Sequence, residues 1–233
     1  MRNQERKIAN KVYIVVGYTS WSKDIFKRKI SKYLGKWYFI SSRKQLTGEK
    51  VKTINPKYIF FLHWSWKVQE GIIKNYECVC FHMTDLPYGR GGSPLQNLII
   101  RGYKNTKLTA LRMTKDFDAG PIYLKRPLSL KGRAEEIYFR ASNLAAEMIL
   151  KIIKNRIVPK PQEGRAVIFK RRKPEESEIP ECKNIKELYN YIRMLDAEGY
   201  PRTFIKYKGF IFKFSRPTLS RDVISCEVKI KKA

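Results

Sequence analysis

The chain has 233 residues, and at about 150 residues per domain this length predicts one substantial core with a smaller appendage and excludes three domains. Hydrophobic residues make up 43% of the sequence and aromatic residues 13%, which excludes a disordered chain. The 49 lysines and arginines against 21 acidic residues give a formal net charge of +28, so we expect an anionic partner: phosphate groups, an anionic cofactor or a polyanion. Charge alone does not single out nucleic acid, because codon bias or a solvated thermophile surface also enriches lysine.

The residues that hold metals and form disulfides are sparse. The four cysteines show no CxxC pair and no dense framework, which predicts reduced thiols in a cytoplasmic protein. The two histidines cannot complete a zinc-finger or HExxH spacing, so we expect no metal site. No run approaches 18 apolar residues, and residues 1–10 lack the apolar middle of a signal peptide, so we expect no membrane association.

Short apolar runs alternate with helical patterns through the first hundred residues. The runs read as strands at 12–17, 37–41, 58–62 and 78–81, and the patterns between them as helices at 21–34 and 68–75. This alternation predicts an α/β fold with a parallel sheet. Ser93 before Pro94 predicts an N-cap for a helix over 95–102, which Gly102 ends.

The middle of the chain predicts two paired strands, at 107–114 and 120–128, and a long amphipathic helix at 134–154 that closes the first domain. Residues 159–180 are rich in proline, glycine and charge, which predicts a linker with one short strand at 166–169 and a boundary near Pro174. The basic cluster at 170–173 is interpreted as a solvated turn.

The last part of the chain predicts a helix and a small antiparallel sheet. Asn184 and Glu187 form a capping-box-like start for a helix over 185–195, and alternating segments follow at 203–209 and 210–214. We therefore expect a core at 1–174 and a small α+β subdomain at 175–233. So short a tail buries too little to stand alone, so we expect it to pack on the core or, by sheet addition, on a second copy in a homodimer.

Polar and turn-forming residues gather where the strand at 78–81 ends. The strand runs directly into His82, and ligands of open parallel sheets bind at such carboxyl ends. Asp118 follows another predicted strand, where its carboxylate could reach the imidazole, fix the tautomer and favour the cation. The pair predicts acid–base proton transfer. The alternatives are a structural histidine at the strand end and an aspartate in a tight turn.

Two segments carry a family resemblance. HMTDLPYGRGGSPLQNLIIRG resembles the HPSLLPxYRGxxP segment of formyltransferases that use 10-formyltetrahydrofolate, and DFDAGPIY resembles their LDTGxI segment. YIRMLDAEGYPRTFI and KGFIFKF resemble the tail that follows the core in the methionyl-tRNA and nucleotide-sugar formyltransferases. The resemblance implies a Rossmann-like core with a mostly parallel sheet, followed by a small helix and antiparallel β appendage. It also implies transfer of a formyl group from the folate to an amine.

The resemblance assigns roles to three positions. His82 matches the histidine that shuttles protons, and Asp118 matches the aspartate that pairs with it. Cys80 stands where the family has asparagine, and a thiol is a weaker donor than an amide. Loss of an oxyanion donor costs roughly 2.7 to 4 kcal/mol of transition-state stabilisation, so another residue would have to replace it. Thr84 and Asn97 are the candidate substitutes, and the alternative is an inactive relative.

The resemblance also places the two binding sites. The family's pterin pocket corresponds to the segment after the strand at 58–62 and to the two residues before Asp118. The predicted folate-binding residues are His63, Trp64, Ser65, Trp66, Lys67, Val68, Asp116 and Phe117. The alternative is that the tryptophans pack the core. The GRGG sequence offers mobile backbone amides to an acceptor with phosphate or hydroxyl groups, its alternative being a glycine turn; the predicted acceptor-binding residues are Thr84, Tyr88, Arg90, Gly91 and Asn97.

Length guides the choice of acceptor. Too few residues follow Pro180 for the C-terminal barrel of the tRNA enzymes that the chain resembles, so we expect a UDP-, dTDP- or GDP-linked amino sugar of surface polysaccharide or lipopolysaccharide biosynthesis. The charge of +28 favours the alternative of a methionyl-tRNA formyltransferase-like enzyme. Glycinamide ribonucleotide also competes as the acceptor, and a catalytically impaired basic relative that binds RNA or protein would need no acceptor at all.

Overall fold

A six-stranded sheet forms the centre of the computed structural model, which describes residues 8–233; residues 1–7, most of the segment tested for a signal peptide, lie outside the described part. The strand order is β2-β1-β3-β4-β6-β7, in which β1 to β4 are parallel and β6 and β7 are antiparallel. The strands are β1 (Val12–Val16), β2 (Lys36–Ile40), β3 (Tyr58–Phe61), β4 (Cys78–His82), β6 (Asn105–Arg112) and β7 (Ile122–Ser129). The predicted α/β class with a mostly parallel sheet is confirmed.

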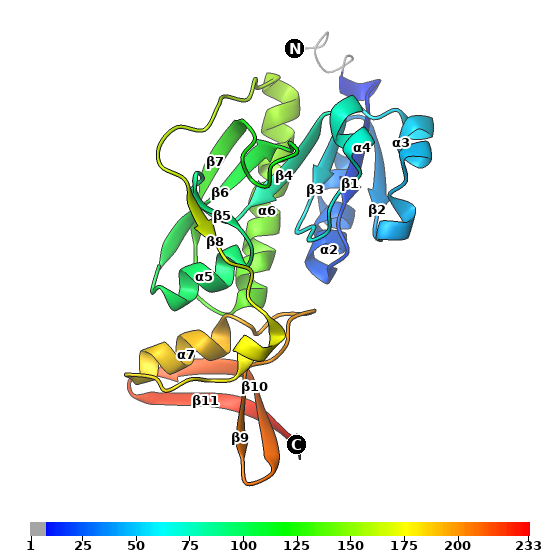
Figure 1. Ribbon diagram of the computed structural model, residues 1–233. Coiled ribbons are helices and arrows are strands. Elements are labelled where there is room, and N and C mark those ends of the chain that lie inside the picture. The colour runs from blue at the N-terminus through cyan, green and yellow to red at the C-terminus, as the bar shows by residue number, and fades with distance from the viewer. Residues whose placement is uncertain (1–7) are drawn as a thin grey trace.

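Both faces of the parallel part are covered, as Figure 1 shows. Successive side chains of a strand point to opposite faces, so Tyr13 and Val15 belong to one apolar cluster while Ile14 and Val16 belong to the other. This double burial explains why the strands are continuous apolar runs in the sequence. The first cluster packs against α2 (Ser20–Arg28) and α6 (Ala134–Asn155), and the second against α3 (Gly48–Ile54) and α4 (Glu70–Asn75).

A second, two-stranded sheet holds the segment between β4 and α5 (Pro94–Ile100). Its strand β5 (Tyr88–Gly91) pairs in parallel with β8 (Val167–Phe169), from the segment predicted as a linker. Ser93 occupies the predicted N-cap position of α5, but its hydroxyl makes no capping bond: its φ is 49° and the hydroxyl accepts from the Arg172 N–H at 3.0 Å instead. The pairing of β8 with β5 therefore ties this part of the linker to the core.

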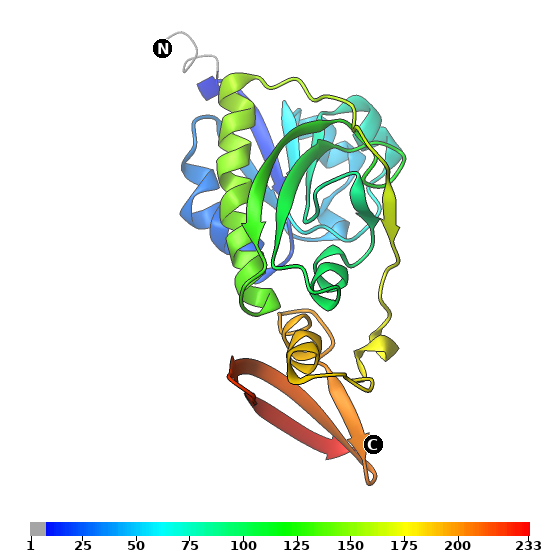
Figure 2. The same ribbon diagram turned by 90° about the vertical axis from the view of Figure 1, so that its left-hand side faces the viewer.

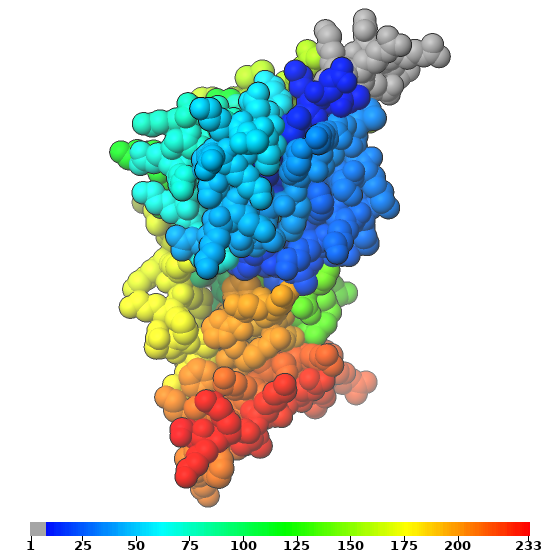
Figure 3. All heavy atoms as spheres, turned by 90° about the vertical axis from the view of Figure 1, so that its right-hand side faces the viewer, coloured from blue at the N-terminus to red at the C-terminus, as the bar shows by residue number. Residues whose placement is uncertain are grey.

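The C-terminal part contains α7 (Ile185–Arg193) and an antiparallel sheet of β9 (Phe204–Tyr207), β10 (Phe210–Ser220) and β11 (Val223–Lys232). The predicted helix start is confirmed, because Asn184 Oδ1 accepts from the Glu187 N–H at 3.0 Å. Helix α7 lies between the core and this sheet, as Figure 2 shows, and in Figure 3 the sheet extends beyond the larger α/β body. The Arg193 guanidinium donates to the carbonyls of Leu130 and Gly132, so the tail packs on the core.

The remaining helical turns are short 3-10 segments at Ile30–Lys32, Arg43–Gln45 and Pro174–Ser177. The helix predicted over 21–34 is therefore shorter than expected, because the first of these turns follows α2. Among the described residues, no helix is both long enough and apolar enough to cross a membrane.

Candidate active site

His82 and Asp118 come together at the carboxyl end of β4. Nδ1 of His82 lies 3.3 Å from Oδ1 of Asp118, and the two side chains are 8% and 18% exposed. The other carboxylate oxygen, Oδ2, accepts from the Gly91 N–H at 2.9 Å. Strand β5 thus supplies a backbone donor to the carboxylate that faces the imidazole.

The loop that carries Asp118 begins at the opposite end of β4 from His82. Strand β6 is antiparallel to β4, with Arg112 beside Val79 and Thr109 beside His82. The loop must therefore fold back along the sheet to bring its carboxylate to the imidazole. We predicted that His82 and Asp118 meet because both follow strands whose carboxyl ends are adjacent. In the structure they meet because the loop folds back.

Both ring nitrogens of His82 face acceptors. Nε2 lies 2.7 Å from the carbonyl oxygen of Gly89, while Nδ1 faces the Asp118 carboxylate. Which ring nitrogen carries the N–H depends on the tautomer. The Gly89 carbonyl covers the Nε2 side of the ring, so another group reaches Nε2 only by displacing that contact.

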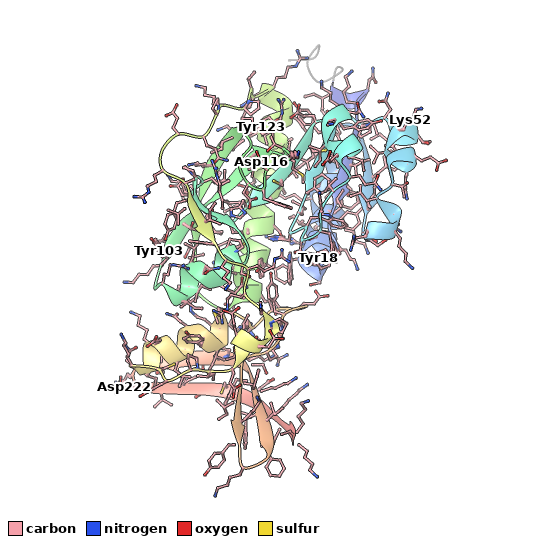
Figure 4. All side chains as sticks on the ribbon, in the orientation of Figure 1. Tyr18, Lys52, Tyr103, Asp116, Tyr123 and Asp222 are labelled. Carbon is pink, nitrogen blue, oxygen red and sulfur yellow. The ribbon has the colours of Figure 1, made fainter. Side chains whose placement is uncertain are left out.

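The pair lies on the wall of a cavity of about 780 Å³. The cavity brings together most of the predicted catalytic and folate-binding residues and two of the predicted acceptor-binding residues: His63, Trp64, Ser65, Trp66, Lys67, Cys80, His82, Arg90, Gly91, Phe117 and Asp118. Val68 and Asp116 line a smaller adjoining pocket of about 70 Å³, which shares Cys80 and Asp118 with the cavity. In Figure 4 the labelled Asp116 lies on the core, well away from Asp222 in the C-terminal sheet.

Three predicted acceptor-binding residues lie outside both pockets. The buried Thr84 hydroxyl donates to the Gly89 carbonyl at 3.3 Å, and the Tyr88 hydroxyl accepts from Tyr103 at 3.0 Å. The Asn97 amide nitrogen donates to three backbone carbonyls, of Gly92, Ser93 and Lys170. The structure therefore does not bring Thr84 or Asn97 to the site as the substitute donor that the sequence suggested.

The glycines after Arg90 are held in place. The Gly91 N–H binds Asp118, and the Gly92 N–H donates to the Phe169 carbonyl at 3.0 Å. Gly91 has a φ of 99°, and a Cβ there would lie 2.6 Å from the same carbonyl oxygen, so the close pairing with β8 requires glycine. The prediction of mobile amides at GRGG is wrong, because strand pairing fixes them.

Cys80 faces both pockets from the middle of β4. Burial, and next the nearby Asp118 carboxylate, raise the pKa of its thiol well above the usual range. The group is therefore a neutral thiol rather than a nucleophilic thiolate, and as a donor it is weak.

Aromatic side chains form one side of the cavity. Trp64 and Trp66 line it with ring centroids 4.7 Å apart, and Tyr18 packs on Trp66 with centroids 4.4 Å apart. Trp64 Nε1 and Gln96 Oε1, both from cavity-lining residues, are buried without a partner among the described residues. A flat ring with polar edges fits such a wall, so the predicted pterin site agrees with the residues present.

His63 is a packing residue rather than a second acid–base group. Its Nε2 lies 3.1 Å from the Ser142 hydroxyl, and its ring packs edge-on against Trp21 and Tyr138. Burial lowers the pKa of His63 to about 4, because it disfavours the charged imidazolium.

The depressed pKa of His63 predicts a pH dependence of stability. The unfolded chain binds this proton near pH 6.5 and the folded chain only near pH 4, so folding stability falls as the pH drops through this window. Between pH 6.5 and pH 5 we expect His63 to cost roughly 1.5 kcal/mol of the free energy of unfolding. Urea unfolding of wild type and His63→Gln at both values measures it. An equal pH slope in the two proteins would contradict the assignment.

Several cavity residues were not among the predicted site residues. Arg171, Arg172 and Lys173 line the cavity, and Arg171 and Lys173 are exposed, so the basic cluster interpreted as a solvated turn also borders the site. Tyr138 and Tyr200 also line it, from α6 and the C-terminal part. No local pattern marks the two tyrosines, because distant segments bring them to the cavity. Among the described residues, no group of three or more His, Cys, Asp or Glu could hold a metal ion.

Comparisons with known proteins agree with this geometry. The solved structure of "Methionyl-tRNA formyltransferase from Clostridium thermocellum" is 47% identical, with a TM-score of 0.89, and the match covers 96% of this chain and 100% of that chain. A family model described as "Methionyl-tRNA formyltransferase, C-terminal domain" matches residues 174–231. A curated methionyl-tRNA formyltransferase of Rickettsia bellii is 31% identical over 133 residues, which are 54% of this chain and 44% of that protein. The chain spans about half the length of the curated relatives it matches.

The expectation of a nucleotide-sugar enzyme is wrong. A 4-N formyltransferase from Francisella tularensis shares the fold, with a TM-score of 0.64, but only 16% of its sequence, over 85% of this chain and 93% of that one. A short tail does not exclude a tRNA enzyme, because the family model for the C-terminal domain of methionyl-tRNA formyltransferase matches residues 174–231. The resemblance to formyltransferases, enzymes that draw the formyl group from 10-formyltetrahydrofolate, is confirmed: the chain belongs to the methionyl-tRNA formyltransferase family.

Proposed function

We propose that this protein transfers a formyl group from 10-formyltetrahydrofolate to the amine of methionyl-tRNA. The observation that carries the proposal is the His82–Asp118 pair, 3.3 Å apart on the wall of a cavity large enough for both reacting groups. Family membership supplies the reaction class. The pair supplies the acid–base group that a transfer between two nitrogens needs.

The aromatic side of the cavity fits the folate. Trp64, Trp66 and Phe117 offer ring faces, and Lys67 offers a cation for a carboxylate. When bound, the folate supplies the formyl carbon that is transferred. We place it here because the aromatic wall lies on the same cavity as His82, and these contacts stay a prediction.

The remaining rim fits an acceptor that carries phosphates. Arg90, Arg171, Arg172 and Lys173 line the cavity, and Asp118 is the only acidic residue among the described residues that line it. Phosphate contacts by lysine and arginine dominate RNA affinity, and the whole chain carries +28. We therefore propose that the basic rim receives the acceptor end of the tRNA.

The chemistry assigned to this chain is proton movement at His82. Asp118 Oδ1 lies 3.3 Å from Nδ1 of His82, where a carboxylate can orient the ring of a catalytic imidazole. Nε2 can then take a proton from the attacking amine and return it to the nitrogen that leaves the formyl carbon. The Gly89 carbonyl occupies this nitrogen in the structure, so the acceptor must displace that contact first.

The proposed division of the chain is a catalytic core over 1–174 and a small subdomain over 175–233. The subdomain closes one end of the cavity, because Leu195 and Tyr200 line it. Whether a second copy adds to its sheet stays a prediction, which the molecular mass in solution tests.

One assay tests the proposed function. The purified protein is offered 10-formyltetrahydrofolate with methionyl-tRNA, with uncharged tRNA, or with a 4-amino-sugar nucleotide, and mass spectrometry shows which product gains a formyl group. We expect the added mass on methionine released from the charged tRNA alone. Formylation of the sugar nucleotide, or of no acceptor, would refute the proposal.

Cys80→Asn tests the departure from the family pattern. An amide at this wall of the cavity adds a stronger donor, and an oxyanion donor is worth about a hundred- to a thousandfold in rate. Because Thr84 and Asn97 are engaged elsewhere, we expect the variant to raise kcat tenfold or more. Cys80→Ser, with a small hydroxyl, is the matched control. An unchanged kcat in Cys80→Asn would show that another group already supplies the donor.

A further inference from the structure

Gln162 links the Asp118 loop to β5. Its amide nitrogen donates to the carbonyl oxygens of Asp118 at 2.7 Å and of Gly120 at 2.8 Å. Its amide oxygen accepts from Nε of Arg90 at 3.1 Å and from Nη2 at 2.8 Å. The side chain is half-buried and comes from the segment between α6 and β8, which no sequence motif covers.

The Asp118 backbone needs such support. Its φ is 54°, in the left-handed region that side chains other than glycine rarely adopt, and holding such a residue there costs of order 1 to 3 kcal/mol. Gly120 adds a second constraint, because a Cβ there would lie 1.9 Å from the Arg112 carbonyl oxygen. The loop also starts at the far end of β4, so nothing in the sheet register fixes its turn beside His82.

We propose that Gln162 is a positioning residue that sets the orientation of Asp118 toward His82. Its two donated hydrogen bonds fix the Asp118–Ala119 and Gly120–Pro121 peptide groups, so the Asp118 carboxylate starts from a fixed backbone. The Gly91 N–H then selects the carboxylate rotamer. The inference rests on the proposed function only for its kinetic consequence, because the orientation itself is a property of the free protein.

Arg90 determines which way the Gln162 amide faces. A guanidinium has donors only, so its two N–H groups must meet the amide oxygen. The amide nitrogen is thereby turned toward the two carbonyls of the Asp118 loop. Arg90 also lines the cavity, so its side chain serves both the contact with Gln162 and the predicted contact with the acceptor.

Gln162→Glu separates the two halves of this contact. Glutamate has the same size and keeps an acceptor for Arg90, but its carboxylate cannot donate to the Asp118 and Gly120 carbonyls. We expect kcat to fall on the order of ten- to a hundredfold with both KM values within about twofold, because misplacing a catalytic group by about 1 Å costs up to a hundredfold. Gln162→Met removes every hydrogen bond without adding charge and should give the same loss. Gln69→Glu, at an exposed residue whose side chain does not cap α4, is the matched control.

A spectroscopic readout tests the positioning without turnover. The chain has two histidines, so the ring nitrogen resonances of His82 are assigned in 15N NMR spectra with the variant His82→Asn. In both Gln162 variants we expect the His82 Nδ1–H signal to shift or exchange faster, while the His63 signals stay those of wild type. A wild-type His82 spectrum with unchanged kcat in both variants, or a raised KM with unchanged kcat, would overturn the proposal. Should wild type transfer no formyl group, the proposed function fails while the NMR comparison still decides the role of Gln162.

Discussion

His82→Asn is expected to lower kcat for formyl transfer by about 10²- to 10⁴-fold. Asparagine can still hydrogen-bond Asp118 through its side-chain amide, but it neither accepts nor returns a proton at neutral pH. The imidazole is 8% exposed and lies in hydrogen-bond reach of Gly89, so water does not readily replace it. The loss should therefore appear in single-turnover formylation, where binding and product release do not contribute.

Two controls make this experiment decisive. The far-UV circular dichroism spectrum and the urea midpoint of His82→Asn should stay close to those of wild type, since asparagine is smaller than histidine and retains a polar contact to Asp118. Asp118→Asn is the paired variant: it keeps the hydrogen-bonding shape but removes the charge opposite Nδ1, so it should lose part of the same rate. A His82→Asn enzyme with kcat within tenfold of wild type would remove His82 from the mechanism.

The sequence identified His82 and Asp118 because each lies in a segment with a family pattern. It could not show how they meet, since the Asp118 loop follows an antiparallel strand and folds back along the sheet. There the loop contacts Gly91, which lies in one of the family segments, and Gln162, which carries no pattern of its own. The local motif thus predicts the reacting groups, while the contacts that orient them arise only when β5, β8 and the loop come together.

The same distinction explains which elements were predicted. Strands β1, β3 and β4 are buried on both faces, so their apolar runs are visible without any tertiary information. Strand β5 has the sequence YGRG and reads as a turn, yet it becomes a strand because β8 pairs with it. Strand β11 is exposed along most of its length and gives only a weak alternation, so its pairing with β10 was not predicted.

The predicted acceptor was wrong because the length of the tail was taken as evidence of function. A tail with too few residues for a barrel still folds as α7 and a three-stranded sheet. It also supplies Leu195 and Tyr200 to the cavity, so its contribution to the site does not require a barrel. The charge of +28, the weaker argument at the level of sequence, pointed toward the acceptor that the relatives support.

Asp196→Ala is expected to destabilise the protein by about 1.5–3 kcal/mol, because it removes charge-assisted hydrogen bonds from a buried carboxylate whose arginine partners are only partly exposed. The Asp196 side chain is 4% exposed and lies 2.5 Å from Nη1 of Arg202 and 3.4 Å from Nη1 of Arg133. It also accepts from the Arg216 N–H at 2.9 Å, beside the irregularity in β10. One carboxylate therefore joins the start of α6, the turn after α7 and the C-terminal sheet.

Asp222→Ala is the matched control for this prediction, since Asp222 is exposed at the turn between β10 and β11 and its loss should change stability by about 0.5 kcal/mol or less (Figure 4). Urea unfolding followed by tryptophan fluorescence measures both variants. A loss below about 1 kcal/mol for Asp196→Ala would show that solvation of the Arg133 and Arg202 guanidiniums offsets the broken contacts. Because Leu195 and Tyr200 flank Asp196 and line the cavity, the variant should also raise KM for the acceptor under conditions where it stays folded, which links the stability of the tail to the shape of the site.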